Sequence, residues 1–290
     1  MSLVTNINQF MAAVLDTFKN IGRGKIWLWL LGYFALQALV LLAHWQWLSP
    51  VFHGPITVWL SVAKFLPDLL LPDTSLILFK HYPQHYLVLG AVFTWAKTII
   101  ALLFEGVALG AAAILFHNAY LAHEGERPIA AGSVWSAWPK LIGAWLVLNL
   151  CFIAINIGLP GLFAELLAKS PRRQMVFQFL VIPGLYTVVL SLFFVTIPAI
   201  TTLGDGLFKD LGRSLRLFGR RPFAMLFFSV LVLVLPMTVA TAASRSVDIV
   251  QKFQPELVAW LLMLGLFAEM LAYWFWMGAG TRFLIEIFEE

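Results

Sequence analysis

The sequence predicts an all-α integral membrane protein with six transmembrane helices. Of its 290 residues, 61% are hydrophobic and only 12% are charged, against about 25% charged residues in an ordinary soluble domain. The mean hydropathy is +0.88. Runs of about 20 mostly apolar residues, the length that crosses a bilayer, recur along the whole chain. This composition excludes a soluble enzyme, a disordered chain and a disulfide scaffold, and the single Cys151 makes no intramolecular disulfide.

Six segments are apolar and long enough to span a bilayer. They are Ile26–Leu48, a stretch within Tyr86–His117, Leu141–Leu162, Val176–Leu203, Phe223–Ala243 and Leu257–Phe283. Pro183 and Pro198 in the fourth segment, and Pro236 in the fifth, predict bends, because proline removes a helix hydrogen bond. The carbonyls freed in this way need donors from the protein, so the bends are expected to face neighbouring helices.

The segment of residues 49–85 joins the first two spans and contains five prolines, so it is not one helix. We expect short helices at the membrane surface here, for example over Ile56–Leu66. Lys64, Pro67 and Asp68 argue against a seventh span.

The distribution of Lys and Arg favours cytoplasmic termini, because cytoplasmic loops carry an excess of cations. Eleven cations lie on the side of the N-terminus: Lys19, Arg23, Lys25, Arg127, Lys140, Lys209, Arg213, Arg216, Arg220, Arg221 and Arg282. Seven lie on the other side: Lys64, Lys80, Lys169, Arg172, Arg173, Arg245 and Lys252. The bias is moderate, and Lys169, Arg172 and Arg173 work against it.

Two amphipathic helices are expected at the cytoplasmic interface, one before the first span and one before the fifth. The apolar stripe of the first is Ile7, Phe10, Met11, Val14, Leu15 and Phe18, and that of the second is Leu207, Phe208, Leu211, Leu215 and Phe218. Seven cations of these regions are predicted to contact anionic lipids or a partner: Lys19, Arg23, Lys25, Arg213, Arg216, Arg220 and Arg221.

These two segments align without a gap at an offset of 197 residues. The alignment places Gly22 over Gly219, and both are expected in the left-handed turn that ends a helix. Asp205 is expected to cap the second helix. Residues 133–138 resemble a shortened third copy. The chain therefore reads as one transmembrane domain, 1–290, with three predicted repeats, 5–122, 128–203 and 204–284. The alternative is that amphipathic helices simply recur before spans.

The stretch Pro198–Pro236 combines a span ending in proline, an amphipathic Ser/Arg helix, a glycine, a basic residue and a new span. Pro198, Ser214, Arg216, Gly219 and Arg220 carry the pattern. It resembles a signature of poorly characterised bacterial six-span inner-membrane proteins, including the membrane domain attached to some glycerophosphodiester phosphodiesterases. Ala108–Leu146 is similar more loosely, through Glu124-Gly125. The resemblance implies a six-span layout and no established activity.

Three ionisable residues lie inside the predicted spans, where charge is costly and often functional. Lys97 and Glu105 share nearly one face of the second span, about 12 Å apart along its axis. Glu269 lies near the middle of the sixth. A Glu105–Glu269 pair across the bundle would bind a cation or share a proton. The alternative is that local hydrogen bonds satisfy each group, or that Glu105 stays protonated.

Motifs for catalysis, metals and cofactors are missing from the sequence. It contains no HExxH, no Walker motif and no Gly-x-Ser-x-Gly elbow. The histidines are expected at the interfacial surface and form no haem site. We therefore predict no catalytic residue, no metal and no cofactor.

Gly106 and Gly110 form a small-xxx-small pattern, which allows two helices to approach closely. Packing inside the bundle is favoured over a dimer interface.

Three classes of function compete for a chain of this kind in a bacterial cytoplasmic membrane. The first is a non-enzymatic accessory, organising or regulatory subunit of a membrane complex, with membrane lipids and other membrane-protein subunits as partners. The second is a transporter or permease component for a lipid or other amphiphile, partnered with a cytoplasmic ATPase. The third is a membrane enzyme. A net charge of +4 is too small for a nucleic-acid binder.

Overall fold

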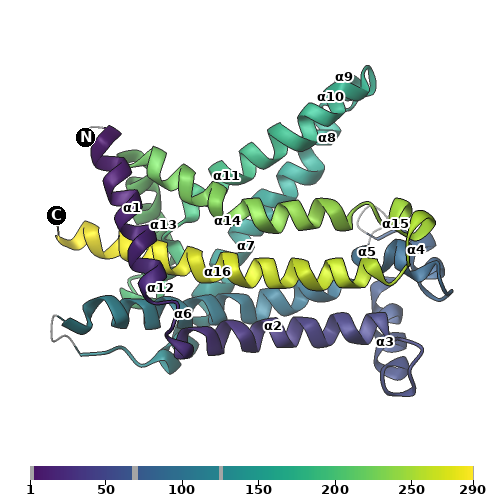
Figure 1. Ribbon diagram of the computed structural model, residues 1–290, viewed down its shortest axis with the longest axis horizontal. Helices are drawn as coiled ribbons and strands as arrows, with labels where there is room; N and C mark the ends of the chain where they lie inside the picture. Colours follow the sequence, from purple (N-terminus) through teal and green to yellow (C-terminus); the bar gives the residue numbers. More distant parts are fainter. Residues whose placement is uncertain (1–2, 67–70, 124–126, 290) are drawn as a thin grey trace. The chain divides into compact units, whose positions relative to one another are not determined.

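A computed structural model describes residues 3–66, 71–123 and 127–289, and every regular element in this part of the chain is helical (Figure 1). The long helices are α1 (Leu3–Lys19), α2 (Gly24–Trp45), α5 (His85–Ile100), α6 (Gly106–Tyr120), α7 (Trp138–Ile153), α11 (Ile182–Phe193), α13 (Leu207–Arg220), α14 (Pro222–Ala243) and α16 (Leu257–Glu289). The shorter helices are α3 (Pro50–Ala63), α4 (Asp73–Phe79), α8 (Leu159–Leu162), α9 (Ala164–Ala168), α10 (Pro171–Val176), α12 (Thr196–Thr202) and α15 (Ser246–Lys252).

Six helical stretches in the described residues are long and apolar enough to cross a membrane. They are Gly24–Trp45, His85–Tyr120, Ala131–Leu162, Pro171–Thr202, Pro222–Ala243 and Leu257–Glu286. Each contains or overlaps one of the six predicted spans. The prediction of an all-α, six-span membrane protein is therefore confirmed.

The chain divides into two compact units, which share several long helices. Unit 1 comprises residues 1–30, 105–233 and 273–290, and unit 2 comprises residues 31–104 and 234–272. Each unit is described separately below.

In unit 2, the segment that joins the first two spans forms the short helices α3 and α4, as its prolines predict. Ile56 and Leu60 of α3 and Leu76 and Phe79 of α4 are buried in one apolar cluster with Leu89 of α5. Pro67 and Asp68 lie outside the described residues. The segment is therefore a packed part of unit 2, and no seventh span forms in its described residues.

Two histidines of unit 2 depart from the expectation of surface positions. His44 and His85 are each only 2% exposed, and both rings pack edge-on against Phe79. The ring of His53, by contrast, is exposed and stacks on Trp47. The spacing of prolines showed that this segment is not one helix, but it did not show that the helices fold over the two histidines.

Unit 1 is built around α6, which is lined with small residues. Every residue from Gly106 to Ile114 is buried. A Cβ on Gly106 would come within 2.8 Å of Leu141 Cβ, and one on Gly110 within 2.7 Å of Thr201 Cγ2 and 2.8 Å of Val134 Cγ2. Both glycines therefore let helices of the same chain approach closely.

The fourth span is interrupted before α12, four residues upstream of Pro198. Pro198 has no N–H to donate to the carbonyl of Phe194, which would be its normal helical partner. The indole Nε1 of Trp276 on α16 donates to this carbonyl instead, at 2.8 Å. The expectation that a carbonyl freed by proline meets a neighbouring helix is confirmed here. In the fifth span, α14 continues through Pro236, and a bend there stays a prediction.

The amphipathic helices α1 and α13 bury matching positions. Ala13 and Thr17 of α1 are fully buried, as are Asp210 and Ser214, which lie 197 residues later. At the same offset, Phe18 and Leu215 are about half exposed, at 49% and 45%. The two helices thus turn equivalent faces toward the protein, and their outer apolar residues are left to meet lipid. The three-fold repeat itself stays a prediction.

Two details of these helix ends differ from expectation. Gly22 and Gly219 do not adopt left-handed backbone angles; among the described residues only Gly204 and Gly206 do. The turn with positive φ precedes α13, where Gly206 (φ 136°) occupies the N-cap position expected for Asp205. The carboxylate of Asp210 accepts a hydrogen bond from the Gly206 N–H at 3.2 Å. The side chain that binds the start of α13 therefore belongs to a residue within the helix and not to Asp205.

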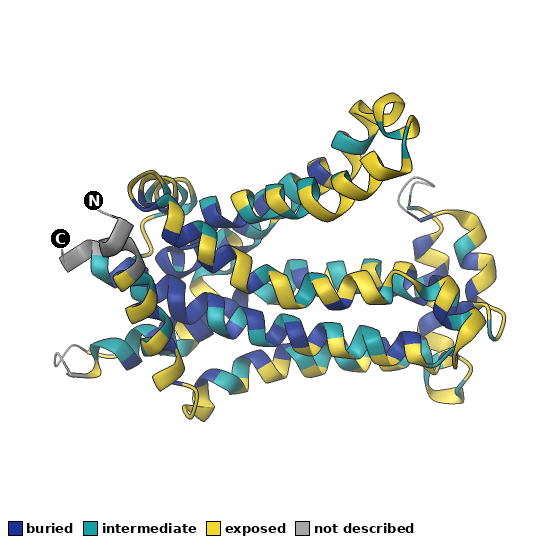
Figure 2. Cartoon of the chain, turned by 45° about the horizontal axis from the view of Figure 1, so that its top comes forward, coloured by how far each residue is buried: buried dark blue, intermediate teal, exposed yellow. Residues whose placement is uncertain are grey.

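Residues 154–181, which we call the arm, form the loop end of the hairpin between spans three and four. The arm consists of a π-helical turn, α8, α9, α10 and a second π-helical turn. Most of its residues are exposed (Figure 2), including Leu162 at 80% and Leu180 at 71%. The arm packs on itself and on α7 and α11.

Candidate functional site

Lys97 and Glu269 form an ion pair in unit 2. The Lys97 Nζ lies 2.5 Å from both carboxylate oxygens of Glu269, and each side chain is about one quarter exposed. The sequence placed both residues inside spans but suggested a partnership between Glu105 and Glu269. The cation that compensates Glu269 is instead supplied by Lys97 of the same unit, 172 residues away in sequence.

Glu105 lies in unit 1, at the end of a π-helical turn, Ala101–Glu105, that interrupts the second span. Its Oε2 accepts a hydrogen bond from the indole Nε1 of Trp145 at 3.3 Å. π-helical turns redirect a side chain within a helix and are frequent at functional positions. Here the turn is followed directly by Gly106, whose close contact with Leu141 brings α7 and its Trp145 toward the carboxylate.

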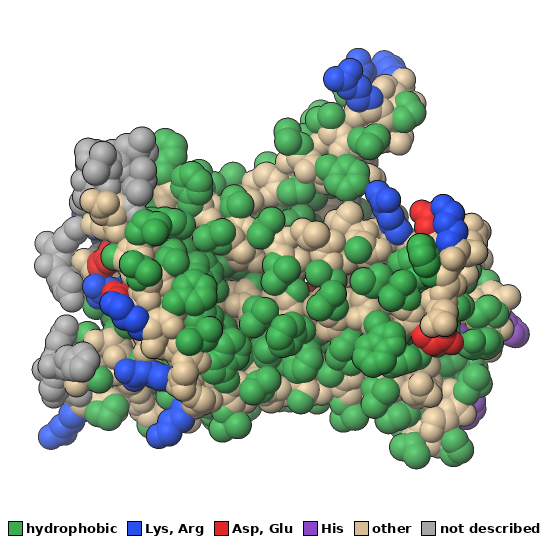
Figure 3. Space-filling model, in the orientation of Figure 1, with side chains coloured by type: hydrophobic (Ala, Val, Ile, Leu, Met, Phe, Trp, Pro, Cys, Tyr) green, Lys and Arg blue, Asp and Glu red, His purple; other side chains and the backbone are tan. Residues whose placement is uncertain are grey.

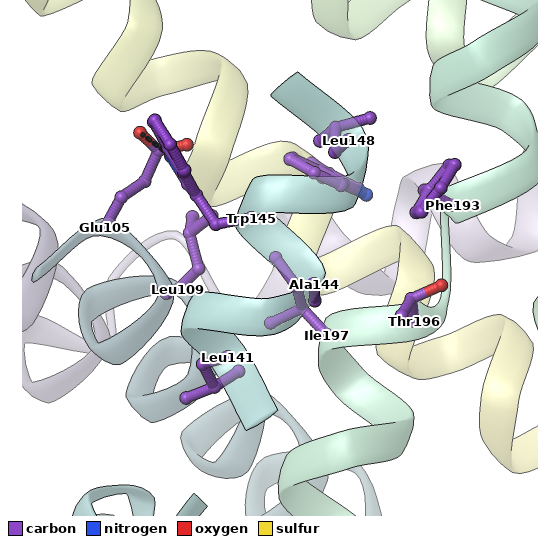
Figure 4. A pocket seen from close by; sticks show the side chains of 11 residues that line it. Glu105, Leu109, Leu141, Ala144, Trp145, Leu148, Phe193, Thr196 and Ile197 are labelled. Atoms are coloured by element: carbon purple, nitrogen blue, oxygen red, sulfur yellow. Dashed lines mark hydrogen bonds between the residues drawn. The ribbon is translucent and has the colours of Figure 1, made fainter. Parts of the chain in front are cut away.

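A small cavity adjoins Glu105 (Figure 4). Its free volume is about 10 Å³, close to the space that one water molecule needs. Leu109, Leu148, Phe193 and Ile197 make most of its wall apolar. A cavity of this size and lining does not hold a polar substrate.

A chain of ionic contacts joins α1, α14 and α16 in unit 1. Arg221 Nη1 lies 3.0 Å from Glu286 Oε2, and Arg282 Nε lies 3.8 Å from Glu286 Oε1 and 3.2 Å from Asp16 Oδ2. Lys19 extends the chain to Asp16 at 2.8 Å. Sequence reasoning missed Glu286 and Asp16 as functional residues. The spacing of Arg282 and Glu286, four residues apart on one helix, is the signal that could have suggested a pair.

The prediction that Arg221 contacts lipid headgroups is wrong, because its side chain is buried. Its side chain is 2% exposed, pairs with Glu286 and lies over the Phe283 ring, 6.0 Å from the centroid. A basic run in the sequence suggested a solvated surface, whereas the end of α13 turns Arg221 into the protein. It therefore fixes α14 to α16.

Arg213 also has acidic partners close at hand. Its guanidinium forms ion pairs with Asp205 and with the buried Asp210, the latter at 2.6 Å, and Lys209 lies 3.1 Å from Asp205. Hydrogen bonds from Arg213 and Lys209 hold the pKa of Asp205 below its usual value. Burial lowers the pKa of Arg213, but its hydrogen bonds to Asp205 and Asp210 outweigh this and raise the pKa overall. Arg213 thus stabilises the start of α13.

The remaining predicted cations are exposed, and among them Lys19 also pairs with Asp16. They are Lys19, Arg23, Lys25, Arg216 and Arg220. Contact of these residues with anionic lipid or with a partner stays a prediction.

Among the residues that the structure describes, His, Cys, Asp and Glu form no group of three or more that would hold a metal ion. The arrangement as a whole is that of a multi-pass α-helical membrane protein whose charges inside the spans are partnered within the chain. Comparison with protein-family models, with curated proteins and with solved structures finds no match. The resemblance of Pro198–Pro236, and more loosely of Ala108–Leu146, to bacterial six-span proteins stays a prediction. Glu124-Gly125, on which the looser resemblance rests, lies outside the described residues.

Proposed function

We propose that the chain is a non-enzymatic accessory subunit that organises or regulates a membrane complex. The single observation that carries this proposal is the arm, which exposes large apolar side chains on both of its helical limbs. Phe179 is 52% exposed, Met175 59%, Leu180 71% and Leu162 80%. In a membrane, a surface of this kind meets either lipid or a helix of another subunit, and the arm is open to such a helix because it makes few contacts with the rest of its own chain.

The partnered charges support the same proposal. A transporter needs a polar path or a substrate site near the middle of the membrane. Here Glu269 is neutralised by Lys97, and Glu105 accepts the Trp145 N–H beside a cavity no larger than about one water molecule. These contacts favour a structural role for the three residues over ion or substrate binding.

Site-specific photocrosslinking tests the proposal. A photoreactive phenylalanine analogue at Leu180 is expected to yield a discrete adduct with another membrane protein in intact cells, identified by mass spectrometry. The matched control is the same analogue at Leu28 of α2, which is equally exposed at 70% but lies outside the arm. Adducts with lipid alone at both positions, or equal protein adducts at both, contradict the proposal.

A permease component with a cytoplasmic ATPase is the second candidate. It is favoured by the exposed cations Lys209, Arg216 and Arg220 on α13, which together offer a basic surface to a soluble partner. Recovery of an ATPase with the wild-type chain, and its loss in Arg216→Gln/Arg220→Gln, would support this alternative. Recovery of an integral membrane protein without an ATPase would support the accessory subunit.

We infer that the protein lies in a bacterial cytoplasmic membrane with both termini in the cytoplasm. The inference rests on the cation count, eleven against seven. In a Cys151→Ser background, a cysteine at residue 23 is expected to be protected from an impermeant thiol reagent in intact cells, and one at residue 172 to be labelled. Labelling at residue 23 with protection at residue 172 would show that the orientation is the opposite of the one inferred.

A further inference from the structure

The arm contains an open groove between α9 and α10, with a volume of about 430 Å³. Its wall is apolar and includes Leu166, Leu167, Phe177 and Val181. Arg172 and Arg173 line the same groove, together with Ser170. One continuous surface thus presents a hydrocarbon lining and two permanent positive charges.

The two arginines are not used by the fold. Both are exposed, and neither forms an ion pair or a hydrogen bond through its side chain in the part of the chain that the structure describes. Glu165, the acidic residue nearest to them in sequence, is exposed as well and does not pair with them. Cations gather at the end of the arm above an apolar shaft (Figure 3), where they comprise Lys169, Arg172 and Arg173.

The predicted orientation of the chain does not explain these cations either. The positive-inside tendency sets orientation through an excess of cations in cytoplasmic loops. Lys169, Arg172 and Arg173 belong to a loop on the opposite side and reduce the excess. The position of Arg172 and Arg173 at the groove suits them instead to contact a ligand there.

We propose that this groove binds an anionic phospholipid, with the phosphate at Arg172 and Arg173 and an acyl chain along the apolar wall. The planar guanidinium fork matches phosphate oxygens in geometry and charge. The groove lies at the end of two membrane-spanning limbs, where hydrocarbon gives way to headgroups. A phospholipid therefore meets both halves of the surface at once. The site goes beyond the proposed accessory role and holds whether or not a partner subunit exists.

The apolar wall distinguishes a lipid from a soluble anion. A free phosphate or a glycerol phosphate would engage the arginines but make no contact with Leu167, Phe177 and Val181. A phospholipid covers these side chains, which adds apolar burial to the charge contact. The wall thus predicts that the acyl chain contributes to affinity.

Native mass spectrometry of the full chain in detergent tests the charge contact. Titrated phosphatidylglycerol is expected to bind about tenfold more tightly than phosphatidylcholine, and Arg172→Gln/Arg173→Gln to lower the phosphatidylglycerol affinity by about tenfold. Lys169→Gln is the matched control, since Lys169 is an exposed cation of the same tip that does not line the groove. Equal binding of the two lipids, or an equal loss in Lys169→Gln, overturns the proposal.

A second variant tests the apolar wall without altering charge. Val181→Trp places a large ring in the groove and is expected to weaken phosphatidylglycerol binding while Arg172 and Arg173 remain. Glycerol phosphate is expected to bind far more weakly than phosphatidylglycerol. Equal affinity of glycerol phosphate and the lipid, or unchanged lipid binding in Val181→Trp, shows that no acyl chain occupies the groove and overturns the proposal. Unchanged elution and thermal unfolding establish that each variant is folded.

Discussion

The α6 region and the arm belong to the same unit and are both strongly apolar, but they are buried to very different extents. Every residue from Gly106 to Ile114 is buried, whereas most residues of the arm are exposed. The α6 region uses Gly106, Gly110 and a run of alanines, whereas the arm uses Leu, Phe and Met. Since lipid is as apolar as leucine, hydropathy does not decide which helices pack. Side-chain size does, because small residues let backbones approach.

The charged residues of the packed part of unit 1 and those of the arm also differ in how far they are buried. Arg221 is buried in the packed part of unit 1 and pairs with Glu286, which is 14% exposed, while Arg172, Arg173 and Glu165 of the arm are exposed. The packed part therefore depends on its charges for stability, and the arm keeps its charges free for contacts outside the chain.

The largest effect is expected from breaking the buried pair in the packed part. Glu286→Gln removes the carboxylate that pairs with the buried Arg221, and the loss of one partner of a buried pair costs about 3–5 kcal/mol. The cation–π contact with Phe283 favours the lower end of this range. Denaturation in detergent micelles measures the loss. Glu165→Gln in the arm is the matched control, expected within about 0.5 kcal/mol of wild type because its carboxylate is exposed. Similar losses in the two variants would remove the distinction between the regions.

The spans could be predicted from the sequence because each is a long and mostly apolar run. The short helices between the first two spans could be predicted as well, since Pro50, Pro55 and Pro72 exclude a single helix. The exposure of the arm could not be predicted from hydropathy, because Leu162 and Leu180 are as apolar as buried leucines. The run of residues 106–113, in which small residues predominate, has no counterpart in the arm, and this contrast was the signal that could have shown it.

The sites were predictable only in part. Lys97, Glu105 and Glu269 were found because ionisable residues inside an apolar run stand out. Their partners were not found, because the pairing of Lys97 with Glu269 depends on which helices are neighbours. Arg221 was misplaced for a similar reason: its sequence neighbours are basic and exposed, and its partner Glu286 is 65 residues away. The local sequence pattern shows where a charged residue lies along a helix. Its partner depends on the tertiary structure.

A smaller effect is expected from adding one methyl group to the packed part. In Gly106→Ala the new Cβ would lie 2.8 Å from Leu141 Cβ, an atom that moves only with its backbone. Overpacking of this kind costs about 1–3 kcal/mol. Gly184→Ala in α11 is the control, since a Cβ there meets no atom within 4 Å and alanine favours the helix. Thermal unfolding in detergent should show a lower midpoint for Gly106→Ala alone. A loss of equal size at Gly184 would mean that glycine acts through helix propensity and not through close approach.

The smallest effect is expected from acid, and it should appear in α13 but not in the arm. Hydrogen bonds from Arg213 and Lys209 lower the pKa of Asp205 from its ordinary value of 3.8. A carboxyl group with a lowered pKa stabilises the folded state above its ordinary pKa, and this contribution is lost as the pH falls through the lowered value. The stability difference between wild type and Asp205→Asn should therefore be fully present above about pH 5 and vanish in stronger acid. The effect is small because Asp205 is exposed and its ion pairs are screened by water. Hydrogen exchange of the α13 amides at several pH values measures it, with the arm amides as the internal reference because Arg172 and Arg173 have no carboxylate partner to lose. A difference that does not change with pH would show that Asp205 holds α13 through its shape and not through its charge.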